Sequence, residues 1–110
     1  MSNIQTDKKL LSFLGLAAKA GKIMSGEFQT ETAVKSGTAY LVLVATDASE
    51  NTKKLFRDKC SYYRVPFYEL GTKGELGAAI GKEYRASLAI VDEGLAKAVQ
   101  KKIMEQDSQV

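Results

Sequence analysis

The chain has 110 residues, which fits one domain of about 100–200 residues, and its net charge of +3 permits a nucleic-acid partner without requiring one. Apolar residues at 45% and charged residues at 26% exclude a disordered, collagen-like or coiled-coil chain. The absence of His and the presence of a single Cys exclude the usual general base, internal disulfides and thiolate metal sites, so we expect no metal, no cofactor and no catalysis.

The first third of the sequence predicts two helices joined by a short extended link. The first helix opens at residues 6–9 and stops at Gly21. Its apolar stripe consists of Leu10, Phe13, Leu14 and Ala17. Residues 22–25 predict the link, and the second helix starts at residues 25–26 and runs through Ser36. Its inward-facing residues are expected to be Thr30, Ala33 and Val34.

The middle of the sequence predicts a strand, a helix and a second strand. Residues 40–45 form a continuous apolar run, which is typical of a strand buried on both faces. Ser49 is placed to cap a helix that runs to about Tyr63. We expect its apolar stripe to be Leu55, Phe56, Cys60 and Tyr63. Residues 65–68 predict a short strand.

The last third predicts a helix, a strand and a helix. Thr72 and Glu75 form a capping box for a helix that runs to about Ile80. Residues 88–91 predict another buried strand, and Asp92 caps a last helix. The core residues of this helix are expected to be Leu95, Val99 and Ile103. The alternating elements predict an α/β fold: a single-domain three-layer α/β/α sandwich with a small mixed central sheet and frayed ends at about 1–5 and 106–110.

Few side chains are placed for catalysis. Cys60 lies on an apolar stripe without a His partner, so we interpret it as structural. Asp47, Asp92 and Glu93 follow predicted strands, where we favour helix caps over catalytic acids. The sequence contains no phosphate-binding P-loop and no GxGxxG after a strand, so a nucleotide-dependent enzyme is the weaker hypothesis.

The placement of basic residues is more informative than their number. Lys19 and Lys22 flank a glycine just before the second helix, and Lys82 and Arg85 flank the loop before the last strand. Cations beside exposed backbone donors favour phosphate binding. The third helix carries a further group of cations, which we interpret as a solvated face: Lys53, Lys54, Arg57, Lys59 and Arg64.

The order of the elements and the residues within them resemble a known family. The segments that carry the resemblance are 15–22, 25–26, 39–49, 65–67, 75–82 and 89–91. From about Leu10 to Ile103 the chain is similar to the ribosomal L7Ae/L30e family of RNA-binding proteins, most of all to its small bacterial, ribosome-associated YlxQ-type members. The resemblance implies a three-layer α/β/α sandwich that binds kink-turn RNA, a bent duplex with sheared G·A pairs.

The family recognises RNA through the N-terminus of its second helix, where it typically reads Gly-x-Asn-Glu-x-x-Lys. Gly26 matches this motif, whereas Phe28, Gln29 and Thr32 replace the Asn, Glu and Lys. Gln29 can still donate and accept at a base edge. Phe28 either stacks on an unpaired base or packs inside the protein. We therefore expect RNA binding, with weak recognition of a standard kink-turn.

The family's second contact corresponds here to residues 82–87, where Tyr84 can stack and Lys82 and Arg85 can contact phosphates. The expected RNA-binding residues are Lys19, Lys22, Ser25, Gly26, Phe28, Gln29, Thr32, Lys82, Tyr84 and Arg85. With no run of about 18 apolar residues and no secretory leader, we expect a cytoplasmic protein without a membrane partner.

At the level of function, the sequence predicts a monomeric, non-catalytic, ribosome-associated protein that binds structured RNA. Ribosomal RNA is the expected partner, and ribosomal proteins are further candidate partners. The alternative is a protein-interaction module on the same fold that docks through its third helix, near Leu55 and Tyr62.

Overall fold

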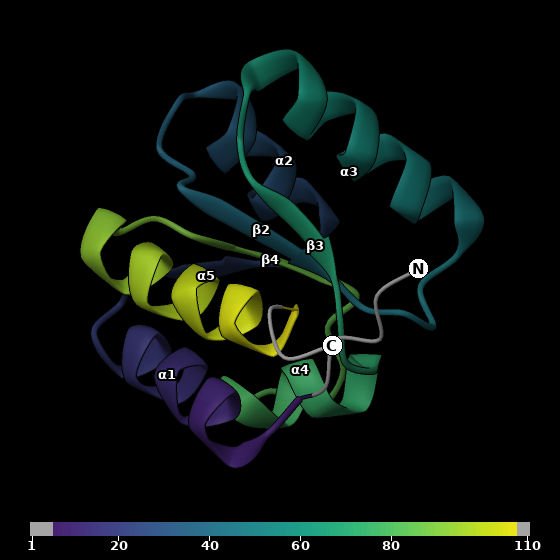
Figure 1. Ribbon diagram of the computed structural model, residues 1–110. Coiled ribbons are helices and arrows are strands. Elements are labelled where there is room, and N and C mark those ends of the chain that lie inside the picture. The colour runs from purple at the N-terminus through teal and green to yellow at the C-terminus, as the bar shows by residue number, and fades with distance from the viewer. Residues whose placement is uncertain (1–5, 108–110) are drawn as a thin grey trace.

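The computed structural model describes residues 6–107, in which five helices and four strands follow one another along the chain (Figure 1). In order these are α1 (Lys8–Lys19), β1 (Ile23–Ser25), α2 (Glu27–Lys35), β2 (Leu41–Val44), α3 (Glu50–Tyr63), β3 (Phe67–Glu69), α4 (Lys73–Ala79), β4 (Ser87–Ile90) and α5 (Glu93–Asp107).

The strands form one mixed sheet in the order β1-β4-β2-β3. β4 is antiparallel to both β1 and β2, with Val42 opposite Ala89, and β2 is parallel to β3. Helices α2 and α3 cover one face of the sheet, and α1, α4 and α5 cover the other (Figure 1). Every residue of β2 and β4 is buried, as expected for central strands covered on both faces. The predicted three-layer α/β/α sandwich with a small mixed sheet is confirmed.

Side-chain caps start α1 and α3, and the cap of α3 is the predicted Ser49. The Asp7 carboxylate accepts a hydrogen bond from the Leu10 amide at 2.8 Å and begins α1. Ser49 accepts from the amide of Thr52 at the start of α3. Such caps satisfy amides that have no acceptor inside the helix.

The two later helices also start at the predicted residues. Thr72 and Glu75 form the predicted capping box of α4, in which each side chain accepts from the other residue's amide. The carboxylate of Asp92 accepts from the Leu95 amide at 2.9 Å in the first turn of α5.

Several local expectations differ from the structure. Residues 23–25 are not a link but an edge strand, because their backbone pairs with β4. Tyr63 is 38% exposed rather than part of the apolar stripe, because α3 ends there and Arg64 adopts a left-handed conformation that redirects the chain. Helix α5 continues to Asp107, past the expected start of the frayed tail, and the other expected frayed residues, 1–5 and 108–110, lie outside the described residues.

Candidate nucleic-acid interface

The start of α2 and the loop before β4 lie side by side at one end of the sheet. Because β1 and β4 are antiparallel, with Ser25 opposite Leu88, the chain leaving β1 lies beside the chain that leads into β4. The Gly26 amide donates to the Ser87 carbonyl at 3.0 Å, and Arg85 Nε donates to Ser25 Oγ at 3.1 Å. Residues 25–29 and 82–86 therefore form one surface, which we call the paired-loop surface.

Gly26 gives this surface an open helix terminus. Its φ of +90° and ψ of 160° belong to a region that side chains with a Cβ rarely adopt. A Cβ at Gly26 would meet nothing within 4 Å, so the backbone conformation, and not crowding, is the reason for glycine. No side chain caps α2. The first-turn amides therefore remain accessible to an anion that approaches the helix terminus.

Two aromatic side chains of the paired-loop surface face solvent. Phe28 is 81% exposed and Tyr84 is 62% exposed. The alternative in which Phe28 packs inside the protein is therefore wrong. Gln29 and Thr32, which replace two polar motif residues, are also exposed on α2. Exposed aromatic rings beside polar side chains are the arrangement that single-stranded RNA bases stack on.

A buried polar contact supports the paired-loop surface from below. The Ser87 hydroxyl donates to Thr30 Oγ1 at 3.4 Å, and both residues are almost fully buried. Thr30 Oγ1 in turn donates to the Met24 carbonyl at 3.4 Å. This chain of hydrogen bonds joins α2, β1 and β4. The sequence placed Thr30 inward but gave no signal for Ser87 as its partner, because 57 residues separate them.

Gly77 supports the same surface from α4, and the sequence did not single it out. A Cβ at Gly77 would lie 2.6 Å from the Glu83 carbonyl oxygen and 2.9 Å from Tyr84 Cα. The backbone of residues 83–84 therefore rests directly on α4. A close glycine contact of this kind is invisible in a single sequence, because nothing local distinguishes it from an ordinary helical glycine.

The structure separates two of the predicted cations from the paired-loop surface. Lys22 lies at the other end of β4, where its carbonyl accepts from the amide of Val91. Lys19 lies in the last turn of α1. Lys82 is exposed in the loop between α4 and β4, three residues after the end of α4. Of the four predicted phosphate ligands, Arg85 is the one that bonds to both parts of the surface, through Ser25 Oγ and the Tyr84 carbonyl.

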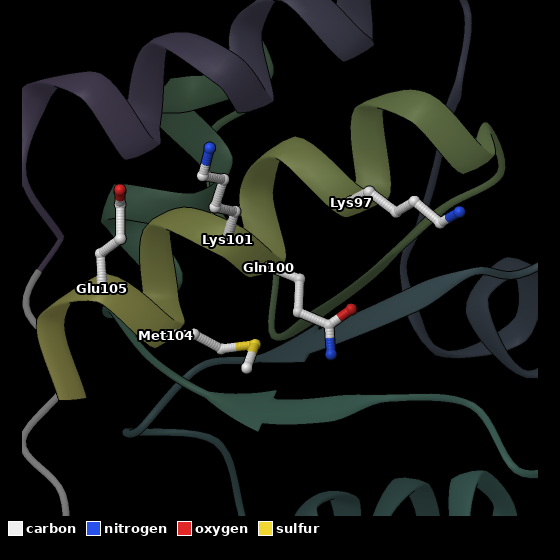
Figure 2. A pocket seen from close by; sticks show the side chains of 5 residues that line it. All are labelled: Lys97, Gln100, Lys101, Met104 and Glu105. Carbon is white, nitrogen blue, oxygen red and sulfur yellow. The ribbon is translucent and has the colours of Figure 1, made fainter. Parts of the chain in front are cut away.

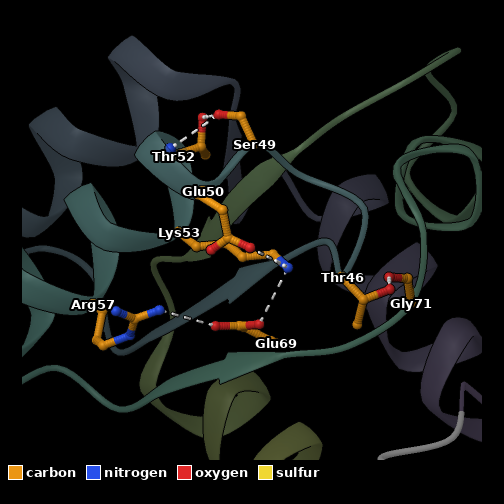
Figure 3. Close-up of polar contacts among 8 residues, drawn as sticks. All are labelled: Thr46, Ser49, Glu50, Thr52, Lys53, Arg57, Glu69 and Gly71. Atoms are coloured by element: carbon orange, nitrogen blue, oxygen red, sulfur yellow. Dashed lines mark hydrogen bonds and ion pairs between the residues drawn. The ribbon is translucent and has the colours of Figure 1, made fainter.

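The cations of α3 are held by carboxylates of the protein (Figure 3). Lys53 lies 3.8 Å from Glu69 and 3.9 Å from Glu50, and Arg57 lies 3.6 Å from the second oxygen of Glu69. Only 15% of the Lys53 side chain is exposed, so the interpretation of this helix as a solvated face is wrong for that residue. Lys54 bonds to Asp58 at 2.6 Å. These pairs reduce the positive charge that α3 presents to a phosphate.

The side chains that the sequence analysis weighed as catalytic candidates have structural roles. Asp47 accepts from the Lys73 amide at 2.9 Å, so it caps α4 and not the helix that follows it. Glu93 forms an ion pair with Lys97 at 3.3 Å. Cys60 is 1% exposed, and its burial raises the pKa of the thiol to about 11.

The side chains of residues 6–106 include no group of three or more that could hold a metal ion. No helix in this part of the chain has the length and apolar character needed to cross a membrane.

The chain matches known proteins over most of its length. The model of the ribosomal protein L7Ae/L30e/S12e/Gadd45 family matches residues 8–100. The RNA-binding protein YlxQ of Enterococcus faecium is 47% identical over 90 residues, which cover 82% of this chain and 86% of the relative. The RNA-binding protein YlxQ of Bacillus subtilis is 45% identical over 83 residues, covering 76% and 83%.

A solved structure of a Bacillus halodurans protein, described as of unknown function, superposes with a TM-score of 0.86 at 39% identity. It covers 89% of this chain and 99% of its own. Together, the extent of the family match and the identity to these relatives show that this chain belongs to the ribosomal protein L7Ae/L30e/S12e/Gadd45 family.

Proposed function

We propose that this chain is one RNA-binding domain that is not an enzyme and that binds structured RNA through its paired-loop surface. One observation carries the proposal: the two solvent-facing aromatic residues, Phe28 and Tyr84, lie on segments that are bonded to each other. The bonds between these segments run from Gly26 to Ser87 and from Arg85 to Ser25. The description of both similar YlxQ proteins as RNA-binding supports it.

Each part of the surface has a distinct task in this proposal. Gly26 lets the RNA backbone approach the α2 amides, and Gln29 contacts a base edge. Phe28 and Tyr84 stack on bases that have left the helix, and Arg85 contacts a phosphate. Ser25 keeps Arg85 in place through its hydroxyl.

The other predicted contact residues take outer positions in this proposal. Lys82 adds a phosphate contact on the loop, and Thr32 lies about one helical turn beyond Phe28 on α2. Lys19 and Lys22 contact only an RNA long enough to extend past β1, because Lys22 lies at the other end of β4.

The preferred RNA presents an unpaired base rather than a standard kink-turn. Recognition of sheared G·A pairs requires polar side chains, and the apolar ring of Phe28 offers neither a donor nor an acceptor. Stacking on an extruded base requires only an accessible ring, which Phe28 and Tyr84 supply. We therefore propose a hairpin or junction of ribosomal RNA with an extruded base as the ligand class.

The test measures RNA affinity against salt concentration, using a hairpin with one bulged base and a standard kink-turn. Arg85→Ala should weaken binding to both RNAs and reduce the salt slope by about one, because one phosphate contact is lost. Gln29→Ala should reduce discrimination between the RNAs at nearly unchanged slope. Lys54→Ala is the matched control, since its side chain is 71% exposed on α3. An equal loss of affinity for Lys54→Ala and Arg85→Ala contradicts the proposal.

We propose further that the protein acts as a monomer in the cytoplasm, bound to the ribosome or to its RNA during assembly. The ribosomal proteins of its family support this setting. Co-sedimentation of the protein with ribosomal particles in a sucrose gradient, lost in Phe28→Ala, is the expected result.

A second candidate function is protein docking through α3. It is favoured by a hollow of about 600 Å³ at Leu55, Tyr62 and Tyr63, where Tyr62 is 79% exposed. Mapping of the bound surface by NMR separates the two functions, because RNA binding shifts amides of the paired-loop surface and docking shifts those of α3.

A further inference from the structure

The outer face of α1 carries two apolar hollows that share a wall. The first has a volume of about 380 Å³ and lies between α1 and α5, with Phe13 and Leu16 among its lining residues. The second has a volume of about 660 Å³ and lies between α1 and α4, with Leu11, Gly15, Leu16 and Ala79 in its lining. We call this surface, formed by both hollows, the α1 groove face.

Leu16 is the apolar residue common to the two hollows. Leu16 is 55% exposed, so its apolar side chain is open to a partner from both hollows. The glycine at position 15 lets α4 approach closely, because a Cβ there would lie 3.3 Å from the Ala79 carbonyl oxygen. The apolar lining on one side of Leu16 is therefore the Phe13 ring, and on the other side it is the small and aliphatic residues Leu11, Gly15 and Ala79. Exposed apolar floors of this kind fit side chains of a protein partner better than phosphates.

Lysines border both hollows, and no acidic residue lines either one. Lys8 borders both, Lys9 and Lys102 border the first, and Lys19 borders the second. Lys102 lies 3.5 Å from Glu105. Lys8, Lys9 and Lys19 form no ion pair with any side chain in the range 6–106. The α1 groove face therefore presents positive charge that the described residues do not neutralise.

A neighbouring hollow on α5 shows the contrast (Figure 2). Its lining includes Glu105 as well as Lys97 and Lys101, so both signs of charge are present. Figure 2 shows Lys101 and Glu105 pointing to the side of α5 on which α1 lies. Gln100, in the same hollow, donates to the Tyr68 hydroxyl at 3.3 Å. That hollow offers no single charge that would select a partner.

We propose that the α1 groove face binds an acidic amphipathic helix of a partner protein. Apolar side chains at helical spacing enter the two hollows on either side of Leu16, and carboxylates on the flanks of that helix pair with Lys8, Lys9 and Lys19. Because α1 lies on the opposite side of the sheet from α2 (Figure 1), the partner leaves the α2 residues of the paired-loop surface, Phe28 and Gln29, free. An RNA short enough not to reach Lys19 binds at the same time as the acidic helix.

The test uses a fluorescent helical peptide of about 18 residues with Leu at positions i, i+3, i+4 and i+7 and Glu on its flanks. One control peptide has the same composition with Leu spread around the helix, and another replaces Glu by Lys. We expect the first peptide to bind roughly tenfold or more tightly than either control, measured by fluorescence anisotropy. In NMR spectra of the full chain, it should shift amides of α1 and leave those of residues 25–29 unchanged.

Leu16→Glu places a carboxylate on the apolar wall and should weaken peptide binding by roughly tenfold or more, while RNA affinity stays the same. The substitution is compatible with the fold, because the side chain is already exposed. The double variant Lys8→Ala, Lys9→Ala should weaken binding and remove much of its salt dependence. Lys54→Ala, on the other side of the sheet, should change neither measurement.

Three results overturn the proposal. The first is equal binding of the amphipathic peptide and its scrambled control, and the second is unchanged peptide binding by Leu16→Glu. The third is a loss of RNA affinity in the double lysine variant together with no peptide binding, which would assign the α1 groove face to RNA. A failure of the paired-loop proposal would instead appear as equal losses of RNA affinity in Arg85→Ala and Lys54→Ala. Peptide binding would stay intact in that case.

Discussion

Replacement of Gly77 by alanine tests how the loop before β4 is held. The new Cβ would lie 2.6 Å from the Glu83 carbonyl oxygen, 2.8 Å from its carbon and 2.9 Å from Tyr84 Cα. All three are backbone atoms, so no side chain can rotate away, and α4 and the loop must separate by several tenths of an ångström. Overpacking of this kind costs about 1–3 kcal/mol.

Alanine also favours the helix over glycine by up to about 1 kcal/mol, which partly offsets the clash. Since rigid backbone gives way less readily than side chains, we take the upper part of the range and expect a net loss of about 2 kcal/mol. For a chain of this length, this corresponds to a fall in melting temperature of about 8 °C. RNA affinity, measured well below that temperature, should fall as well, because Tyr84 and Arg85 move with the loop.

Gly74→Ala, in the same helix, is the matched control. Its Cβ would meet Thr72 Oγ1 at 3.8 Å and Tyr84 Cε1 at 3.9 Å, which are ordinary contacts. This variant should be as stable as the original protein or more stable by about 0.5 kcal/mol. Thermal and urea unfolding followed by circular dichroism give both values. Equal stability of the two variants would refute the argument that residues 83–84 rest on α4.

Three further predictions concern single side chains. Cys60, whose buried thiol has a pKa of about 11, should react with Ellman's reagent at pH 8 far more slowly in the folded protein than in urea. The hydrogen bond from Lys54 lowers the pKa of the Asp58 carboxyl. The stabilising contribution of this pair is therefore present above the ordinary carboxyl pKa and is lost as pH falls. In an NMR titration, Lys54→Met should return the pKa of Asp58 toward its ordinary value. Asp92→Ala removes the acceptor of the Leu95 amide and should cost about 1 kcal/mol in urea unfolding, whereas Asp92→Asn should cost little.

Local signals in the sequence predicted the helices and central strands well. The caps at Ser49 and Asp92 act within three residues, so each could be read without any knowledge of the fold. The run at residues 40–45 was continuous and apolar, which is typical of a strand covered on both faces. These helices and strands are determined by residues close together in the sequence, so a single sequence is enough to predict them.

The failures concern contacts between distant residues. Strand β1 has three residues and no alternation to reveal it, and it becomes a strand only because β4, more than sixty residues away, pairs with it. Lys22 was grouped with the start of α2 because the two are close in sequence. A strand of three residues carries the chain about 10 Å, which moves Lys22 to the other end of the sheet from Gly26. The ion pairs of Lys53 with Glu69 were missed for the same reason.

The position of β4 in the sheet has a consequence for how the chain folds during synthesis. β4 is the last strand in sequence, yet it lies between β1 and β2. Chains fold from the N-terminus as they emerge, but β1 has no strand partner until residues 87–90 are present. Arg85 precedes these residues, and its hydrogen bond to Ser25 depends on the pairing of β4 with β1, which holds the two segments together. A nascent chain that ends before Ser87 is thus expected not to bind RNA through this surface, so that RNA binding reports a completed sheet.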